Sequence, residues 1–213
     1  MQQCCMTLLP IRTLGDPVLR TPAEPVTTFD TALQRLVDNM IETMYAAPGV
    51  GLAAPQIGVG LRVFVFDTEY DSDDITVPRR PLVVVNPVLE TGPDEQHGSE
   101  GCLSVPGHAY PTTRSATATI RGFDTTGAAI TYQAGGLLAR CFQHETDHLD
   151  GTLYIDRLTG EERRTAQAAL RNGIGATRPV PSIFRGARTR ARGPVTVGEA
   201  QPRQAEGHTH GTS

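Results

Sequence analysis

Hydrophobic residues recur with a helical period in the first part of the chain. The spacing of one buried helix face is followed by Leu33, Leu36, Val37, Met40, Ile41 and Met44. Thr31, with Gln34 three residues later, predicts a capping box at the start of this helix. Pro48 and Gly49 predict its end, because neither residue favours a continuing helix.

The same period returns at residues 137–150. One broad side of this second predicted helix carries Leu138, Cys141, Phe142, Glu145 and Leu149. Gly151 follows as a residue typical of the position just after a helix. A third, more polar helix is predicted over residues 160–171.

Short runs rich in β-branched residues predict strands at residues 61–68 and 81–90, with a polar loop over residues 71–80 between them. Residues 116–123 and 128–133 alternate around residues 124–127, which predicts a hairpin. Strands that precede a buried helix, without strict alternation of strand and helix, favour the α+β fold class over a doubly wound sheet.

Composition predicts one globular domain over residues 1–172 and a disordered basic tail over residues 173–213. Residues up to Asn172 carry 13 arginines and 21 acidic residues, and the later residues carry six arginines and two glutamates. The tail is rich in Pro, Gly, Thr and Ala, so it cannot bury enough apolar surface to fold alone. No apolar run is long enough for a membrane span, and the first ten residues do not resemble a secretory signal.

Cysteine and lysine usage narrows the class of protein. The four cysteines are not spaced like a disulfide framework, which favours a reducing, cytoplasmic setting. All basic residues are arginine, and coding bias is a sufficient explanation of that. The absence of lysine nevertheless excludes a lysine Schiff base, a lysine nucleophile and a P-loop.

The segment His144-Glu145-Thr146-Asp147-His148 lies within the second predicted helix. Residues four apart share a helix face, so two imidazoles there can bind one metal ion. The glutamate between them can accept a proton from a metal-bound water. Histidine pairs at this spacing also occur by chance on exposed helices. The apolar neighbours and the position of the glutamate favour a buried metal site instead.

Two histidines leave a catalytic site short of a third protein ligand. Downstream of His148 no histidine follows before His208, and the acidic residues there form no recognisable signature. Upstream, the segment EGCLS offers Cys102, which can bind a metal ion as a thiolate. A buried core cysteine is the alternative interpretation of Cys102 taken alone.

A third segment, residues 49–58 (GVGLAAPQIG), combines small apolar residues with Gln56. Small residues permit close approach of an extended peptide, and the amide of Gln56 could donate to an oxyanion. A tight packing turn with an exposed glutamine is the alternative.

Together and in this order, the three segments resemble the signature motifs of the peptide deformylase family, GxGLAAxQ, EGCLS and HExxH. The resemblance extends from about residue 11 to residue 158. It implies small antiparallel sheets packed around a buried metal-binding helix. It also implies an enzyme that removes the N-formyl group from the initiator methionine of newly made proteins and releases formate.

The resemblance implies a role for each motif residue. Cys102, His144 and His148 would bind the metal ion, with water as the fourth ligand. Glu145 would move the proton, while the side chain of Gln56 and the main-chain N–H of Leu103 would hold the oxyanion. The substrate-binding residues that it implies are Gly49, Val50, Gly51, Leu137 and Cys141.

The resemblance also implies cofactor and partners. The family typically uses Fe(II), and Zn(II), Ni(II) or Co(II) are the other candidates. The partners would be N-formylmethionyl nascent peptides and, transiently, the ribosome, whose RNA the basic tail could touch. A solvated tail is the simpler expectation, and neither a membrane nor DNA is expected as a partner.

One departure from the family concerns the residues after EGCLS. Family members often carry a substrate-contacting arginine a few residues beyond the proline, whereas this chain has Gly107-His108-Ala109-Tyr110. Arg114 lies too far along to be taken as equivalent. Two rival functions stay open: a metalloprotease that uses the same helix, and a catalytically silent metal-binding protein on the ribosome.

Overall fold

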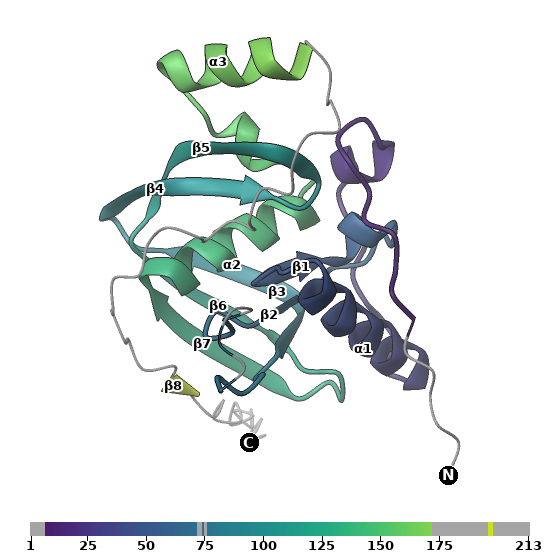
Figure 1. Ribbon diagram of the computed structural model, residues 1–213. Helices are drawn as coiled ribbons and strands as arrows, with labels where there is room; N and C mark the ends of the chain where they lie inside the picture. Colours follow the sequence, from purple (N-terminus) through teal and green to yellow (C-terminus); the bar gives the residue numbers. More distant parts are fainter. Residues whose placement is uncertain (1–6, 72–73, 75, 172–195, 198–213) are drawn as a thin grey trace, which may run out of the picture.

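The computed structural model describes residues 7–71, 74, 76–171 and 196–197 (Figure 1). The helices are α1 (Thr31–Ala46), α2 (Gly136–Leu149) and α3 (Gly160–Arg171), with the 3-10 turns η1 (Pro17–Arg20), η2 (Ala54–Ile57) and η3 (Tyr154–Asp156). The strands are β1 (Gly51–Ala53), β2 (Val63–Phe66), β3 (Leu82–Thr91), β4 (Glu95–Cys102), β5 (Val105–Ser115), β6 (Thr117–Phe123), β7 (Ala129–Gly135) and β8 (Thr196–Val197).

The strands form two antiparallel sheets on either side of α2. The larger sheet has the order β1-β2-β3-β6-β7-β8, and β4 and β5 form a separate two-stranded sheet. In Figure 1, α2 runs between the β4–β5 hairpin above it and the larger sheet below it. This architecture confirms the α+β fold class with small antiparallel sheets around a buried helix.

Helix α2 is enclosed on all of its faces rather than on one side. Every residue from Ala139 to Leu149 is buried. Toward the larger sheet, Phe142 packs in aromatic contact with Phe66, at 5.1 Å between ring centroids, and with Phe64 and Tyr132. Toward the β4–β5 hairpin, the helix presents polar and charged side chains. The buried face of α1 packs against β1 and β2 in a second apolar cluster.

The first helix ends near its predicted boundary, but its predicted cap is wrong. The N-cap is Asp30, whose carboxylate accepts hydrogen bonds from the main-chain N–H groups of Ala32 and Leu33, at 2.8 and 3.0 Å. A carboxylate one residue earlier therefore satisfies the donors that Thr31 was expected to meet. Gln34 instead donates to Asp38, one turn along the helix.

Most other predicted elements are confirmed within a few residues. Strands β2 and β3 lie within or close to the predicted runs, β6 and β7 form the predicted hairpin, and α3 has the predicted bounds. Residues 71–80 form no helix or strand where the structure describes them. Gly151 follows α2 with a positive φ of 70°, as its position after the helix predicted.

Strands β4 and β5 were not predicted. They form a long hairpin in which Glu95 pairs with Ser115 and Cys102 pairs with Val105. As a result, Cys102 lies at the very end of a strand, beside the turn that leads into β5.

Two expectations concern regions that the structure describes only in part. The predicted domain, residues 1–172, contains almost all of the described chain, whereas the predicted tail lies outside the described residues except for Thr196 and Val197, which pair with the edge of β7. Within the described part of the chain, no helix has both the length and the apolar character needed to cross a membrane.

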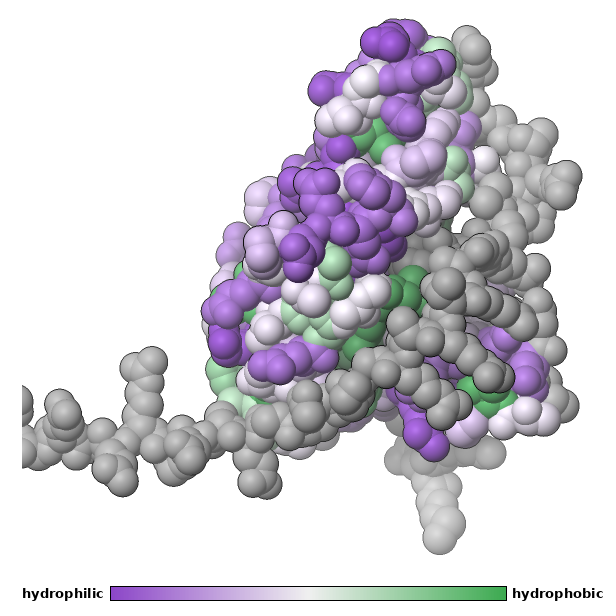
Figure 2. All heavy atoms as spheres, turned by 90° about the vertical axis from the view of Figure 1, so that its left-hand side faces the viewer, coloured by the Kyte–Doolittle hydropathy of each residue, from purple (hydrophilic) through white to green (hydrophobic). Residues whose placement is uncertain are grey.

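Hydrophilic residues cover most of the upper part of the face in Figure 2, where α3 and the hairpin lie, and hydrophobic residues reach the surface lower, at the height of α2.

Candidate metal centre and active site

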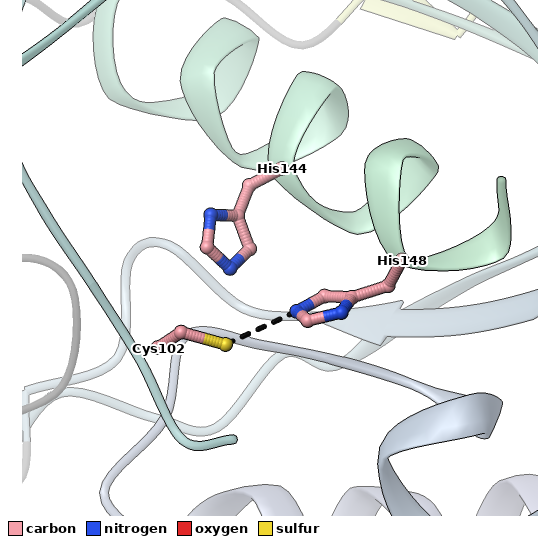
Figure 3. A group of neighbouring side chains, drawn as sticks. All are labelled: Cys102, His144 and His148. Atoms are coloured by element: carbon pink, nitrogen blue, oxygen red, sulfur yellow. Dashed lines mark hydrogen bonds between the residues drawn. The ribbon is translucent and has the colours of Figure 1, made fainter. Parts of the chain in front are cut away.

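Three predicted ligands come together from two elements. Cys102 ends β4, and His144 and His148 lie one turn apart in α2, with all three side chains buried. Their ligand atoms lie within 4.8 Å of one another. The sulfur of Cys102 is 3.1 Å from Nε2 of His148, and both imidazoles point toward the sulfur (Figure 3). Two imidazole nitrogens and one sulfur are thus brought together from segments about 40 residues apart in sequence.

The orientation of His144 is set by Glu100. Nδ1 of His144 lies 3.1 Å from Oε2 of Glu100, and both side chains are almost completely buried. Nε2 of His144 is buried without a hydrogen-bond partner among the described residues. A buried nitrogen of this kind is costly unless something binds it. The carboxylate–imidazole pair therefore leaves one nitrogen free to bind a metal ion, as metal-ligating histidines commonly do.

Burial and neighbouring charges set the protonation of this group. Burial acts to raise the pKa of Glu100, but hydrogen bonds from His144 and Arg114 outweigh it and hold that pKa well below its ordinary value. Burial and the charge of His144 lower the pKa of His148 well below its ordinary value, which favours the neutral, ligating imidazole. Glu100 is therefore a stable anion beside the two histidines.

Glu145 lies beside the metal-ligand set and faces strand β1. It is buried, and its Oε2 has no hydrogen-bond partner among the described residues. Burial, with the charges of Glu100 and Asp147 in the same direction, raises the pKa of Glu145 to about 7. A carboxyl group with this pKa can both accept and release a proton near neutral pH.

Gly51 leaves the space that the Glu145 carboxyl group occupies. A Cβ atom at Gly51 would meet Oε1 of Glu145 and would lie 2.9 Å from its Cδ and 3.1 Å from Sγ of Cys141. The thiol of Cys141 also approaches the carbonyl oxygen of Val50, at 3.9 Å. The structure therefore brings four of the predicted residues together at β1 and α2: Val50, Gly51, Cys141 and Glu145.

The side-chain amide of Gln56 points toward Cys102, one of the three predicted ligands. Its Oε1 accepts from the N–H of Ala53 at 2.8 Å, which orients the side chain. Its Nε2 lies 3.6 Å from the sulfur of Cys102 and 3.3 Å from Oγ of Ser104. The alternative interpretation, in which Gln56 is exposed, is wrong, because Gln56 is only 2% exposed.

The remaining predicted residues lie nearby, with fewer contacts. Leu103 connects β4 to β5, and a Cβ atom at Gly49 would lie 3.1 Å from its Cδ1. Leu137 lies in the first turn of α2, one helical turn before Cys141, and is partly buried. Sequence reasoning did not single out Ser104, whose main-chain N–H is 3.4 Å from the Cys102 sulfur.

The sequence also did not reveal a cluster of buried charges behind the ligands. Arg114 pairs with Glu100 and Asp147, and Arg140 pairs with Glu100. The side chain of Arg114 is 5% exposed, which agrees with the expectation that it is not equivalent to the substrate-contacting arginine of the family. Asp147 lies at a position of the HExxH motif where any residue is allowed, so the motif does not indicate a role for it.

A buried cysteine and two histidines, with a glutamate between the histidines, define the class of metal-dependent hydrolases. The family model for polypeptide deformylase matches residues 8–164. The peptide deformylase of Acidothermus cellulolyticus is 53% identical over 175 residues, which covers 82% of this chain and 92% of that protein. That of Mycolicibacterium smegmatis is 49% identical over 182 residues, which covers 80% and 91%.

Solved structures agree with these relatives. The peptide deformylase of Legionella pneumophila is 41% identical with a TM-score of 0.70, covering 78% of this chain and 95% of that chain. The one from Synechococcus elongatus, in complex with actinonin, is 40% identical with a TM-score of 0.71, covering 81% and 92%. The chain belongs to the polypeptide deformylase family.

Proposed function

We propose that this protein removes the formyl group from the initiator methionine of newly made proteins and releases formate, with Cys102, His144 and His148 as the ligands of one divalent metal ion. The observation that carries the proposal is the convergence of these ligand atoms within 4.8 Å, beside the buried carboxyl group of Glu145. Membership of the polypeptide deformylase family supports the same reaction.

The donor set fits a first-row divalent metal ion. Two imidazole nitrogens and a thiolate suit Fe(II) and Zn(II) as well as Ni(II) and Co(II), and Fe(II) is the ion that the family resemblance implies. Such an ion, when bound, is a Lewis acid that lowers the pKa of water from 15.7 to roughly 7 and so supplies a nucleophile at neutral pH. Metal analysis of protein purified without oxygen identifies the native ion.

The chain's own residues divide the remaining work. Glu145 accepts the proton of the attacking water and passes it to the amine that leaves, for which a pKa of about 7 is suitable. The Nε2 group of Gln56 and the main-chain N–H of Leu103 donate to the oxygen that gains negative charge. One such donor contributes on the order of 3 kcal/mol to transition-state stability.

Strand β1 and its neighbours bind the substrate. Gly49 and Gly51 border the path of an extended peptide, and the absence of side chains there permits close approach. Val50, Leu137 and Cys141 contribute to the pocket for the methionine side chain. Beyond methionine, the segment from Gly107 to Tyr110 carries no arginine, so we propose no charged contact with the substrate there.

The decisive experiment measures formate release from a formyl-methionyl peptide, together with the metal content of the enzyme. Rapid release with about one metal ion per chain supports the proposal. Cleavage of internal peptide bonds without dependence on the formyl group would instead identify a metalloprotease. A full metal site without any release would identify a silent binding protein.

The variant Glu145→Ala tests the proton transfer. We expect it to bind metal as the wild type does and to lose activity by a factor of about 10²–10⁴, the usual contribution of general acid–base catalysis. Glu161→Ala is the matched control, because Glu161 is an exposed residue of the first turn of α3. Turnover by Glu145→Ala near the wild-type rate would contradict the proposed role.

The setting of the reaction completes the proposal. Nascent formylated chains appear at the ribosome, so the enzyme works in the cytoplasm and meets the ribosome transiently. The arginines after Asn172 could strengthen that encounter through phosphate contacts, which weaken steeply as salt rises. Deleting residues 173–213 should then lower ribosome affinity and its salt dependence, and unchanged values would exclude the contact.

A further inference from the structure

A line of buried charged groups connects α2 with the β4–β5 hairpin behind the proposed metal ligands. Its members are Glu100 on β4, Arg114 on β5, Arg140 and Asp147 on α2, and Arg157 just after η3. The first four side chains are at most 8% exposed, whereas that of Arg157 is 53% exposed. Two anions and two cations are thus enclosed together, and the half-exposed Arg157 ends the line at the surface.

Asp147 joins two arginines from different segments. Its Oδ2 accepts from Nη1 of Arg114 at 2.6 Å, and its Oδ1 accepts from Nη2 of Arg157 at 2.6 Å. Nε of Arg157 adds a second bond to the same carboxylate at 3.2 Å. Charge-assisted bonds of this length are the strong ones. Both oxygens of Asp147 are therefore engaged, and neither is directed at the metal-ligand set.

Arg114 carries the connection on to the histidine. It forms a two-pronged pair with Glu100, at 2.9 Å from Nε to Oε1 and 3.0 Å from Nη2 to Oε2. The same Oε2 lies 3.1 Å from Nδ1 of His144. The direction of the His144 ring thus depends on where Arg114 holds the carboxylate.

A second arginine also binds the carboxylate of Glu100. Arg140 donates to Oε1 of Glu100 at 2.7 Å and also bonds the main chain of the hairpin. With Asp147 present, the Nη1 group of Arg114 is anchored on its far side, and Glu100 is shared between two fixed guanidinium groups. Without the Asp147 charge, two buried cations would share one carboxylate, and a buried charge without its partner is strongly unfavourable.

We propose that Asp147 is a positioning residue for the metal ion: through Arg114 and Glu100 it fixes the ring of His144 in the ligating direction. This inference rests on the proposed metal site, and it assigns to the motif residue before His148 a task that the ligands themselves do not perform. Loss of such an outer partner typically weakens metal binding about 10–100-fold.

The test compares wild type with Asp147→Asn, a change that keeps the shape and removes the charge. Metal-free proteins are titrated with Zn(II) in competition with a chelator, and the Co(II) forms are compared by absorption spectroscopy. We expect Asp147→Asn to bind Zn(II) about 10–100-fold more weakly and to show shifted thiolate-to-cobalt and ligand-field bands. Unchanged affinity and an unchanged Co(II) spectrum would overturn the inference.

The matched control is Glu90→Gln. Glu90 on β3 pairs with Arg121 on β6, but both side chains are more than half exposed, at 60% and 51%, and neither bonds to the charge line or the ligands. This variant should bind Zn(II) with wild-type affinity and give the wild-type Co(II) spectrum. Equal weakening by both variants would show a general loss of structure and would overturn the specific role of Asp147.

A second variant keeps the inference testable if Asp147→Asn does not fold. Arg157→Gln removes only the half-exposed end of the line, so it should fold and weaken Zn(II) binding by about 10-fold, the lower end of the range for an outer partner. Binding of Zn(II) by Arg157→Gln with wild-type affinity would overturn the inference. The wild type separates the two hypotheses. If it binds metal but releases no formate, the proposed function fails, whereas the positioning role of Asp147 can still be measured.

Discussion

At the scale of single residues, the site depends on a missing side chain as much as on those present. Gly51 faces the carboxyl group of Glu145 so closely that even a methyl group at that position would displace it. A glycine in a strand often marks a close approach of this kind. Gly51 is therefore required by the neighbouring carboxyl group as well as by the proposed peptide path.

The variant Gly51→Ala should consequently lose most of its activity. A displacement of the Glu145 carboxyl group, the proposed proton carrier, by about 1 Å can lower the rate about 10²-fold, whereas metal content should stay at the wild-type level. Gly60→Ala is the control, because a Cβ atom at Gly60 would meet nothing within 4 Å. Formate release by Gly51→Ala at the rate of the Gly60→Ala control would contradict this account.

The roles of single residues could be predicted from the sequence only where they depend on local spacing or belong to a motif. The histidines and Glu145 follow from helical spacing, and Cys102 from the need for a third ligand. The partners of Glu100 could not be predicted this way, since Arg114 and Arg140 lie 14 and 40 residues further along the chain. Nothing local distinguishes a buried arginine of this kind from a solvated one.

At the scale of elements, α1 begins with Asp30 as its N-cap, and not with the capping box of Thr31 and Gln34 that the sequence pattern predicted. The carboxylate of Asp30 accepts from two main-chain donors that no other helix residue can satisfy. Removing such a cap typically lowers the free energy of unfolding by about 1 kcal/mol.

We therefore expect Asp30→Ala to be destabilised by about 1 kcal/mol, as measured by urea denaturation. Gln34→Ala should change stability by less than about 0.5 kcal/mol, because Gln34 is exposed and its side chain is bonded to Asp38, within the same helix. A larger loss of stability in Gln34→Ala than in Asp30→Ala would instead support the capping box predicted for Thr31 and Gln34.

The β4–β5 hairpin shows why some elements escape pattern analysis. The inward positions of β5 include Thr112 and Arg114, which are buried but polar. Alternation of apolar and polar residues is the usual sequence signal for a strand, and here both faces carry polar side chains. Bonds from Arg140 and Gln96 to main-chain carbonyl groups of the hairpin and of α2 help to hold it in place instead.

At the scale of the whole molecule, the α+β class followed from the order of the predicted elements, but the arrangement of the two sheets around α2 did not. Pairing across the larger sheet joins residues far apart in the chain, such as Val85 with Phe123. The same long range applies to the proposed metal ligands, which join the hairpin to α2. A bound ion would therefore connect two layers of the fold.

Metal binding should accordingly stabilise the folded protein. At a free concentration about 100 times the Kd, a ligand that binds only the native state adds roughly 2.7 kcal/mol. We expect Zn(II) to raise the Tm of the metal-free wild type by several degrees in thermal unfolding. Cys102→Ser should give a much smaller rise at the same Zn(II) concentration, and an equal rise would mean that the ion binds elsewhere.

The enclosure of α2 by both sheets has a consequence for hydrogen exchange. A helix with no open face cannot expose its amide hydrogens by a local movement, so exchange there requires global unfolding. α3, in which only Ala166 is buried, should exchange through local fraying. In deuterated water, peptides from residues 139–149 should therefore be the last to gain mass, at a rate that follows overall stability, while those from residues 160–171 gain it early.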